Sequence, residues 1–194
     1  GYWGARTILR ANGLRTEHLP VDEEGMRLPE NPGVPPRFIF VTPSHQYPLG
    51  PVMSLARRRQ LLAVARRSGS WIIEDDYGSG LAYDNMTLHA MKENDPDDRI
   101  IYVRSLSQIF ASGMRLGYLI SPTRLSESFA SVKRIADIST SGLTQRIFDY
   151  YLRNQLWHQH LTSLKQAYHQ QYQAVRSLLT ELWGNRLTWH EADG

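Results

Sequence analysis

The chain has 194 residues, 41% of them hydrophobic and 21% charged, which is typical of a globular protein with one good-sized core. It contains no cysteine, which excludes disulfide scaffolds and thiolate zinc sites and fits a cytoplasmic location. The net charge of +3 is too small to indicate nucleic-acid binding by itself, and no apolar run reaches membrane-spanning length. We expect no membrane partner.

Both ends of the chain lie inside structural patterns. Residues 1–6 already read as helix and carry no initiator methionine, and residues 191–194 follow the opening of a strand. We therefore expect a segment of a longer polypeptide.

Strands and helices alternate through the first two thirds of the chain. Short apolar runs predict buried strands at 38–42, 71–75, 99–104 and 115–121. Weaker alternation predicts a short strand at 14–21, and one helical turn is expected at 88–92. Helices are predicted at 4–12, at 55–68 between a Ser54 cap and Gly69, from Pro122 to 137, and at 143–183 with a bend near Trp157 and His158.

This order predicts an α/β fold, a mostly parallel sheet flanked by helices on both faces. Parallel strands deliver the loops at their carboxyl ends to one edge of the sheet, where ligands bind. The loops at 42–51, 75–80 and 104–114 should therefore carry the function.

Chemistry-capable residues fill these three loops. They read T-P-S-H-Q-Y-P-L-G at 42–50, D-D-Y at 75–77 and S-L-S-Q-I-F-A-S-G-M-R-L-G at 105–117. Taken alone, the acidic stretch is most simply a strand followed by a polar loop. The order and spacing of all three, together with G-Y-W-G-A-R at residues 1–6, resemble the fold-type I pyridoxal-phosphate enzymes. More closely, they resemble the aminotransferase-like domain of MocR-type regulators of the GntR family, over essentially the whole chain.

The resemblance implies a role for each loop. Asp75 would face the protonated ring nitrogen of pyridoxal phosphate, with Asp76 as the alternative, and Tyr77 would bond the phenolic oxygen. His45 and Tyr47 would lie close to the ring, although loop packing would also explain them.

The same resemblance places the phosphate against the third loop. Ser105, Ser107 and Arg115 would hold it, because a guanidinium offers paired donors to a phosphate. If no phosphate binds there, ordinary turn hydrogen bonds would explain the two serines, and a surface ion pair would explain the arginine.

One position departs from the family pattern. The lysine that forms the Schiff base with the cofactor is replaced by Gln108, and the nearest lysines, Lys92 and Lys133, lie outside the loop. A glutamine amide cannot form an imine or act as the base that moves the substrate proton. The domain would therefore bind pyridoxal phosphate or an adduct non-covalently, or have lost it, with little or no turnover; whether Gln108 is natural or a deliberate replacement stays open.

The sequence thus predicts a cofactor- or effector-sensing domain of a MocR-type transcriptional regulator. Residues 1–156 would be a partial major domain, and 157–194 the start of a smaller α+β domain. We expect a homodimer, a small amine or amino acid as effector, and DNA contact only through a winged helix-turn-helix absent from this chain. The alternatives are a free-standing aminotransferase and a cofactor-free dimerisation module.

Two further features are expected to be structural. The arginines at 57–59, 66 and 67 should form a solvated helix face rather than a nucleic-acid site. His158 and His160 are two apart on a helix and point to different faces, so no metal site is expected.

Overall fold

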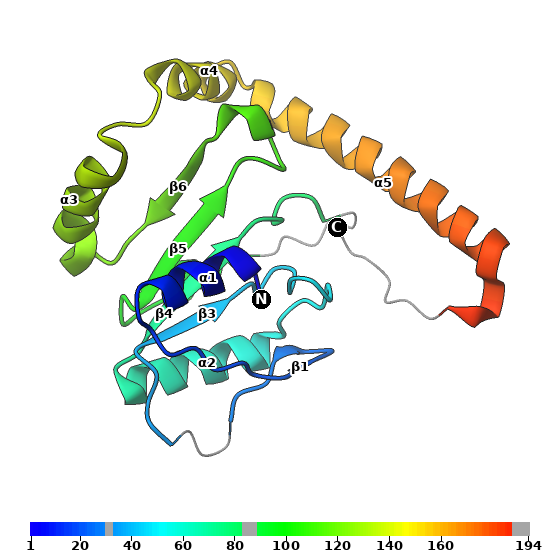
Figure 1. The fold of residues 1–194 in the computed structure, drawn as a ribbon. Helices are drawn as coiled ribbons and strands as arrows, with labels where there is room; N and C mark the ends of the chain where they lie inside the picture. The colour runs from blue at the N-terminus through cyan, green and yellow to red at the C-terminus, as the bar shows by residue number, and fades with distance from the viewer. Residues whose placement is uncertain (30–32, 83–88, 188–194) are drawn as a thin grey trace. The chain divides into compact units, whose positions relative to one another are not determined.

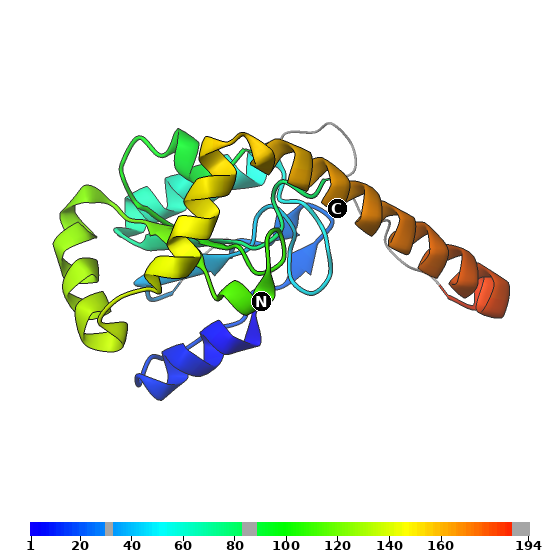
Figure 2. The ribbon, with the colours of Figure 1, turned by 90° about the horizontal axis from the view of Figure 1, so that it is seen from above.

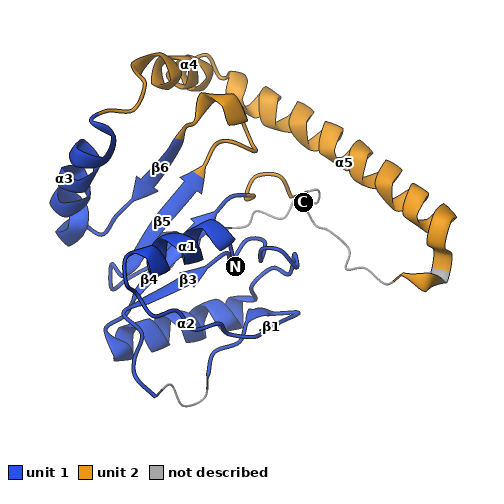
Figure 3. Cartoon of the chain, in the orientation of Figure 1, with its two compact units in different colours: residues 1–77, 89–104, 117–138 blue, residues 78–88, 105–116, 139–194 orange. Residues whose placement is uncertain are grey.

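The computed structural model describes residues 1–29, 33–82 and 89–187, with Asn185 described by its backbone alone. The chain forms two compact units, each built from separate stretches of sequence (Figure 3). Unit 1 comprises residues 1–77, 89–104 and 117–138, and unit 2 comprises residues 78–88, 105–116 and 139–194.

A four-stranded sheet forms the centre of unit 1. Its strands, in spatial order, are β3 (Phe38–Val41), β4 (Trp71–Asp76), β5 (Ile100–Ser105) and β6 (Gly117–Ile120). β3, β4 and β5 are parallel, and β6 runs opposite to β5 (Figure 1). The register sets Val41 beside Glu74 and Asp76 beside Arg104. The predicted mostly parallel sheet is confirmed.

Helix α2 (Leu55–Ser68) has the predicted boundaries because both ends carry local signals. The Ser54 hydroxyl accepts a hydrogen bond from the Arg57 N–H at 3.1 Å, and Gly69 ends the helix at φ 71°. Leu61 and Ala65 of this helix are fully buried. They pack in one hydrophobic cluster with strand residues, and its members are Ile39, Val41, Met53, Leu61, Ala65, Ile72, Met91 and Ile100.

Unit 1 also contains shorter elements. They are α1 (Trp3–Ala11), the two-stranded hairpin of β1 (Val21–Asp22) and β2 (Gly25–Met26), the 3-10 turns η1 (Met91–Asn94) and η3 (Thr123–Leu125), and α3 (Ser126–Asp137).

Two predicted boundaries in unit 1 are wrong. The strand predicted at 14–21 is absent from the described structure, because only Val21 and Asp22 find a partner strand. Pro122 does not begin α3: the Leu125 N–H donates to the Pro122 carbonyl at 2.9 Å and closes η3 first. The helical turn predicted at 88–92 is found later in the chain, as η1 at Met91–Asn94, so only residues 91 and 92 were placed correctly, and residue 88 lies outside the described residues.

Unit 2 is mainly helical. It contains α4 (Gly142–Arg153), α5 (Leu156–Trp183) and the 3-10 turns η2 (Ser112–Met114) and η4 (Gly184–Arg186). The bend predicted near Trp157 is a break at Gln155, whose φ is 57°, and α5 then runs uninterrupted in both views (Figures 1 and 2). None of the helices in the described ranges combines the length and apolar character needed to cross a bilayer.

Candidate functional site

The loop that follows β3 is held in shape by its own hydrogen bonds. The Gln46 side chain donates to the Tyr47 carbonyl at 2.7 Å and accepts from the Leu49 N–H at 3.1 Å. The Tyr47 N–H donates to the Thr42 hydroxyl at 3.1 Å, and the Gly50 N–H to the Gln46 carbonyl at 2.7 Å. This part of the loop therefore has a defined conformation.

Within this loop His45 is buried, whereas the Tyr47 side chain is 39% exposed. The Tyr47 ring contacts Tyr77 edge-on, with ring centroids 6.1 Å apart, and also contacts Tyr2, at 6.2 Å. Burial and the neighbouring Asp75 and Tyr47 raise the pKa of the Tyr77 hydroxyl, which is protonated at neutral pH. Three of the predicted site positions, Tyr47, Asp75 and Tyr77, thus lie together in unit 1.

Strand β4 ends in three consecutive carboxylates that alternate between the two faces of the sheet. Glu74 and Asp76 point to the face covered by α2 and are almost fully buried. Glu74 accepts hydrogen bonds from the N–H groups of Met91, at 2.7 Å, and Lys92, at 2.9 Å. Its carboxylate therefore holds the start of η1.

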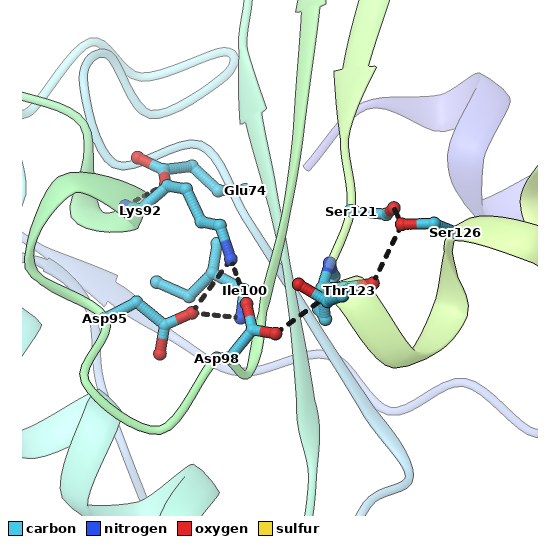
Figure 4. Close-up of polar contacts among 9 residues, drawn as sticks. Glu74, Lys92, Asp95, Asp98, Ile100, Ser121, Thr123 and Ser126 are labelled. Carbon is cyan, nitrogen blue, oxygen red and sulfur yellow. Dashed lines mark hydrogen bonds and ion pairs between the residues drawn. The ribbon is translucent and has the colours of Figure 1, made fainter.

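A polar network continues from this contact to the amino end of β5 (Figure 4). The Lys92 ammonium lies 2.8 Å from Asp98 and 3.3 Å from Asp95. Asp95 also accepts the Ile100 N–H at 2.7 Å, and Asp98 accepts the Thr123 N–H at 3.0 Å. These bonds stabilise the fold at the edge of the sheet away from the predicted ligand loops.

Asp76 is held by two residues of β5. The Tyr102 hydroxyl donates to its carboxylate at 2.5 Å, and the Arg104 guanidinium lies 3.4 Å away. Burial and Asp76 raise the pKa of Tyr102, which therefore remains a donor. Asp76 is thus already supplied with a hydroxyl and a cation from the chain itself.

Asp75 lies on the opposite face and differs from both neighbours. Burial, with a smaller contribution from the Asp76 charge, raises the pKa of Asp75 from 3.8 to about 6, and no hydrogen bond or cation among the described residues lowers it. A half-buried carboxylate without a partner is suited to accept a proton or a cation from a ligand. Of the three carboxylates, Asp75 is therefore the one whose charge is not balanced by a donor or cation among the described residues.

The third loop, residues 105–116, belongs to unit 2. The Leu106 N–H donates to the Leu116 carbonyl at 3.0 Å and closes the loop at its base. The Ser107 N–H donates to the Ser105 hydroxyl at 3.2 Å. Arg115 is exposed and adopts the left-handed conformation at φ 49°, which is uncommon for a residue with a side chain. Such local strain is often found at ligand-binding turns.

Gln108 has an exposed side chain, and helix α5 holds its backbone. The Tyr168 hydroxyl donates to the Gln108 carbonyl at 3.3 Å, and the His160 ring nitrogen to the Ile109 carbonyl at 2.9 Å. Ile109 is buried in a hydrophobic cluster of unit 2, whose other members are Leu81, Leu106, Phe110, Leu116, Phe148, Trp157, Leu161, Leu164 and Tyr168. Packing and these two bonds therefore fix the backbone at Gln108.

Three residues have roles in unit 1 that the sequence did not indicate, and one of them, Arg58, was predicted to lie on a solvated helix face. Tyr102 and Arg104 bind Asp76, and the buried Arg58 bonds the ends of the loop after β3. A signal existed for Arg58, since positions 58, 61 and 65 share one helix face. The roles of Tyr102 and Arg104 could be seen only from the register of β5 against β4, which sets both residues close to Asp76.

The solvated basic face predicted on α2 is found only in part. Arg59, Arg66 and Arg67 are exposed, whereas Arg58 is buried, so the prediction is wrong at that position. Arg57 pairs with Asp22 at 3.1 Å and with Glu24 at 3.2 Å, and Arg66 lies 3.6 Å from Asp97.

The chain matches the family described as aminotransferase class I and II over residues 27–193. The probable rhizopine catabolism regulatory protein MocR of Rhizobium meliloti is 30% identical over 193 residues, which cover 100% of this chain and 39% of that protein. The HTH-type pyridoxine biosynthesis transcriptional regulator PdxR of Corynebacterium glutamicum is 30% identical over 190 residues, covering 96% of this chain and 41% of the relative. The chain thus spans about two fifths of these relatives, and its resemblance to MocR-type regulators is confirmed.

Solved structures show the same fold. The kynurenine aminotransferase of Pyrococcus horikoshii superposes with a TM-score of 0.89 at 22% identity, covering 100% of this chain and 50% of that one. The α-aminoadipate aminotransferase LysN of Thermus thermophilus gives 0.88 at 24% identity, covering 100% and 51%. The predicted fold class, that of the fold-type I pyridoxal-phosphate enzymes, is confirmed.

Proposed function

Because the chain belongs to the aminotransferase class I and II family, we propose that it is the ligand-sensing domain of a MocR-type transcriptional regulator. The ligand would be pyridoxal phosphate or an adduct of it, bound without a covalent link. The observation that carries the proposal is Asp75, a half-buried carboxylate with a pKa raised to about 6 and no compensating cation among the described residues.

The residues of unit 1 fit the ring of this cofactor. A protonated pyridine nitrogen would supply the cation that Asp75 lacks, and the carboxylate would keep that nitrogen protonated. The Tyr77 hydroxyl would donate to the phenolic oxygen, and His45 and Tyr47 would lie along the ring. Relatives of the same fold were solved with pyridoxal-type compounds: PMP in the kynurenine aminotransferase and N-(5'-phosphopyridoxyl)-L-leucine in LysN.

The residues of unit 2 fit a phosphate. Ser105 and Ser107 offer hydroxyl donors, and the exposed Arg115 offers a planar pair of N–H groups. The left-handed backbone at Arg115 ends η2 and would present the side chain at a turn, and such uncommon backbone is often found at ligand-binding turns.

Gln108 sets what the domain would do with the ligand. Pyridoxal phosphate supplies an electron sink when bound, but its use in transamination requires a base at this position. The Gln108 amide neither bonds the cofactor covalently nor moves a proton. The domain would therefore report the presence of the ligand with little or no turnover.

The rest of the proposal concerns the longer protein. Residues 1–156 would belong to the major domain and 157–194 to a smaller one, and two copies would form a homodimer in the cytoplasm. DNA would be bound by a winged helix-turn-helix elsewhere in the polypeptide, and a small amine or amino acid would be the effector. The MocR and PdxR relatives, described as regulators, support this reading.

Equilibrium binding of pyridoxal phosphate tests the proposal. We expect a shifted absorption band that survives dialysis against low cofactor, together with no label at residue 108 after borohydride treatment. Asp75→Asn should abolish this binding, whereas Asp97→Asn, an exposed carboxylate paired with Arg66, should leave it intact. Labelling at Lys92, Lys133 or Lys165 that persists in Asp75→Asn would instead indicate adventitious imines.

Two other outcomes would replace the proposal. Transamination at ordinary enzymatic rates would favour a free-standing aminotransferase. If the unsubstituted protein and Asp97→Asn both failed to bind pyridoxal phosphate, a cofactor-free dimerisation module would be favoured.

A further inference from the structure

We infer that Arg58 is a positioning residue that places the loop after β3, and with it His45 and Tyr47, against the end of β4. The Arg58 side chain projects from α2 into the interior and is only 8% exposed. A buried guanidinium requires a partner for each of its donors. The groups that it bonds therefore identify what it holds.

All three partners are backbone carbonyls from separate segments. The Nε–H donates to Met53 at 3.0 Å, one Nη to Pro43 at 3.1 Å and the other Nη to His89 at 2.6 Å. Pro43 and Met53 are the two ends of the loop, and the Met53 N–H also donates to the Pro43 carbonyl at 2.9 Å. One side chain thus clamps both ends of the loop and joins them to His89, two residues before η1 begins.

The charge of Arg58 connects this clamp to β4. Burial lowers the pKa of the guanidinium, and the carboxylates of Glu74 and Asp76 oppose that effect. Both carboxylates lie on the α2 face of β4, while Asp75 lies on the other. The guanidinium is therefore attracted by the negative charges on β4, the strand that carries Asp75, while its N–H groups bond the two ends of the loop.

His45 and Tyr47 lie inside the clamped segment. The bonds made by Gln46 and Thr42 fix the shape of the loop, but they do not fix its position on the sheet. Arg58 supplies that position and so sets where the Tyr47 ring meets Tyr77. A lysine could not replace it fully, because a single ammonium cannot reproduce the planar fork.

This inference rests on the proposed function only in the assignment of His45 and Tyr47 to a ligand. The test compares Arg58→Gln and Arg58→Lys with the matched variant Arg57→Gln. Arg57 is the adjacent arginine of the same helix, but it donates to the Met26 carbonyl at 2.8 Å and so holds the β1–β2 hairpin instead. Three quantities are measured: amide hydrogen exchange, the His45 ring signals in NMR spectra, and the dissociation constant for pyridoxal phosphate.

In Arg58→Gln we expect faster exchange at Gln46 and Gly50 with β4 amides still protected, and shifted His45 signals. Pyridoxal phosphate should bind about 10- to 100-fold more weakly, the range found when groups that orient metal ligands are removed. Arg58→Lys should recover part of each effect, and Arg57→Gln should show none of them.

Unchanged loop exchange and His45 signals in a folded Arg58→Gln protein would overturn the inference, as would equal effects in Arg57→Gln. Should Arg58→Gln fail to fold, Arg58→Lys decides by the same readouts, because it keeps the charge and loses the fork. If the unsubstituted protein bound no pyridoxal phosphate, the proposed function would fail. Hydrogen exchange and the His45 signals would still test whether Arg58 positions the loop. If the unsubstituted protein bound pyridoxal phosphate normally, and the loop was displaced in Arg58→Gln without any change in affinity, Arg58 would still position the loop, but the assignment of His45 and Tyr47 to the ligand would fail.

Discussion

Ionisation of Asp75 is expected to destabilise the ligand-free protein at neutral pH. Its pKa is raised by burial from 3.8 to about 6, so the folded state holds this proton more tightly than the unfolded chain does. At pH values below the unfolded pKa both states are protonated, and Asp75 has no effect on stability. As the pH rises through the window between 3.8 and about 6 the unfolded chain ionises first, and the free energy of unfolding falls.

The size of this effect follows from the two pKa values. At 1.36 kcal/mol for each unit of pKa, the full cost above the folded pKa is about 3 kcal/mol. Because the carboxylate is only partly buried, solvent screening reduces this to about 2 kcal/mol. Asp75→Asn removes the titration while keeping the shape of the side chain. We therefore expect it to stabilise the ligand-free protein by about 2 kcal/mol at neutral pH, roughly 4–8 °C in Tm, with no gain in the acid range.

Urea unfolding followed by circular dichroism, repeated across the window, measures this difference. Asp76→Asn is the matched control: it weakens the bonds from Tyr102 and Arg104 and should destabilise the protein at neutral pH. A loss of stability in Asp75→Asn at neutral pH would refute the reasoning. So would a gain of equal size at acid pH, since the effect would then not come from ionisation.

Two more predictions concern single contacts. With pyridoxal phosphate, Gln108→Lys should give a covalent link at residue 108 that borohydride fixes and peptide mass spectrometry locates; a variant that bound the cofactor but was never labelled there would contradict the assignment of this position. Tyr102→Phe should lower the free energy of unfolding by about 1–3 kcal/mol, because buried Asp76 loses a donor. Urea titration measures this loss, and an unchanged midpoint would show that the Tyr102 bond to Asp76 contributes no net stability.

Local signals made parts of the fold predictable. Ser54 and Gly69 define α2 because a cap and a left-handed glycine act within a few residues of the chain. The strand predicted at 14–21 failed for the opposite reason, since a strand exists only where a partner strand lies beside it. The break at Gln155 was placed two or three residues late because no glycine or proline marks it.

The candidate site also has features that local sequence predicts and features that depend on contacts between distant parts of the chain. The sequence indicated which loops carry polar groups, but only the family resemblance assigned the ring nitrogen to Asp75, with Asp76 as the alternative; the residues alone gave no basis for the choice. That choice depends on which face of β4 each residue occupies and on Tyr102 and Arg104 across the register. Arg58 was interpreted as part of a solvated face because its carbonyl partners, from Pro43 to His89, are distant in sequence.

The three carboxylates of β4 differ in the partners that the chain gives them, and this difference bears on whether the domain binds a ligand. Glu74 and Asp76 are satisfied by groups of the chain itself, so packing and stability account for both. Asp75 receives no such support among the described residues and is expected to make the ligand-free fold less stable at neutral pH. A residue that breaks the local rules of stability is expected at a functional site, where a bound partner offsets the cost. A purely structural module would have no use for such a carboxylate, whereas a cationic ring nitrogen would convert its cost into binding free energy.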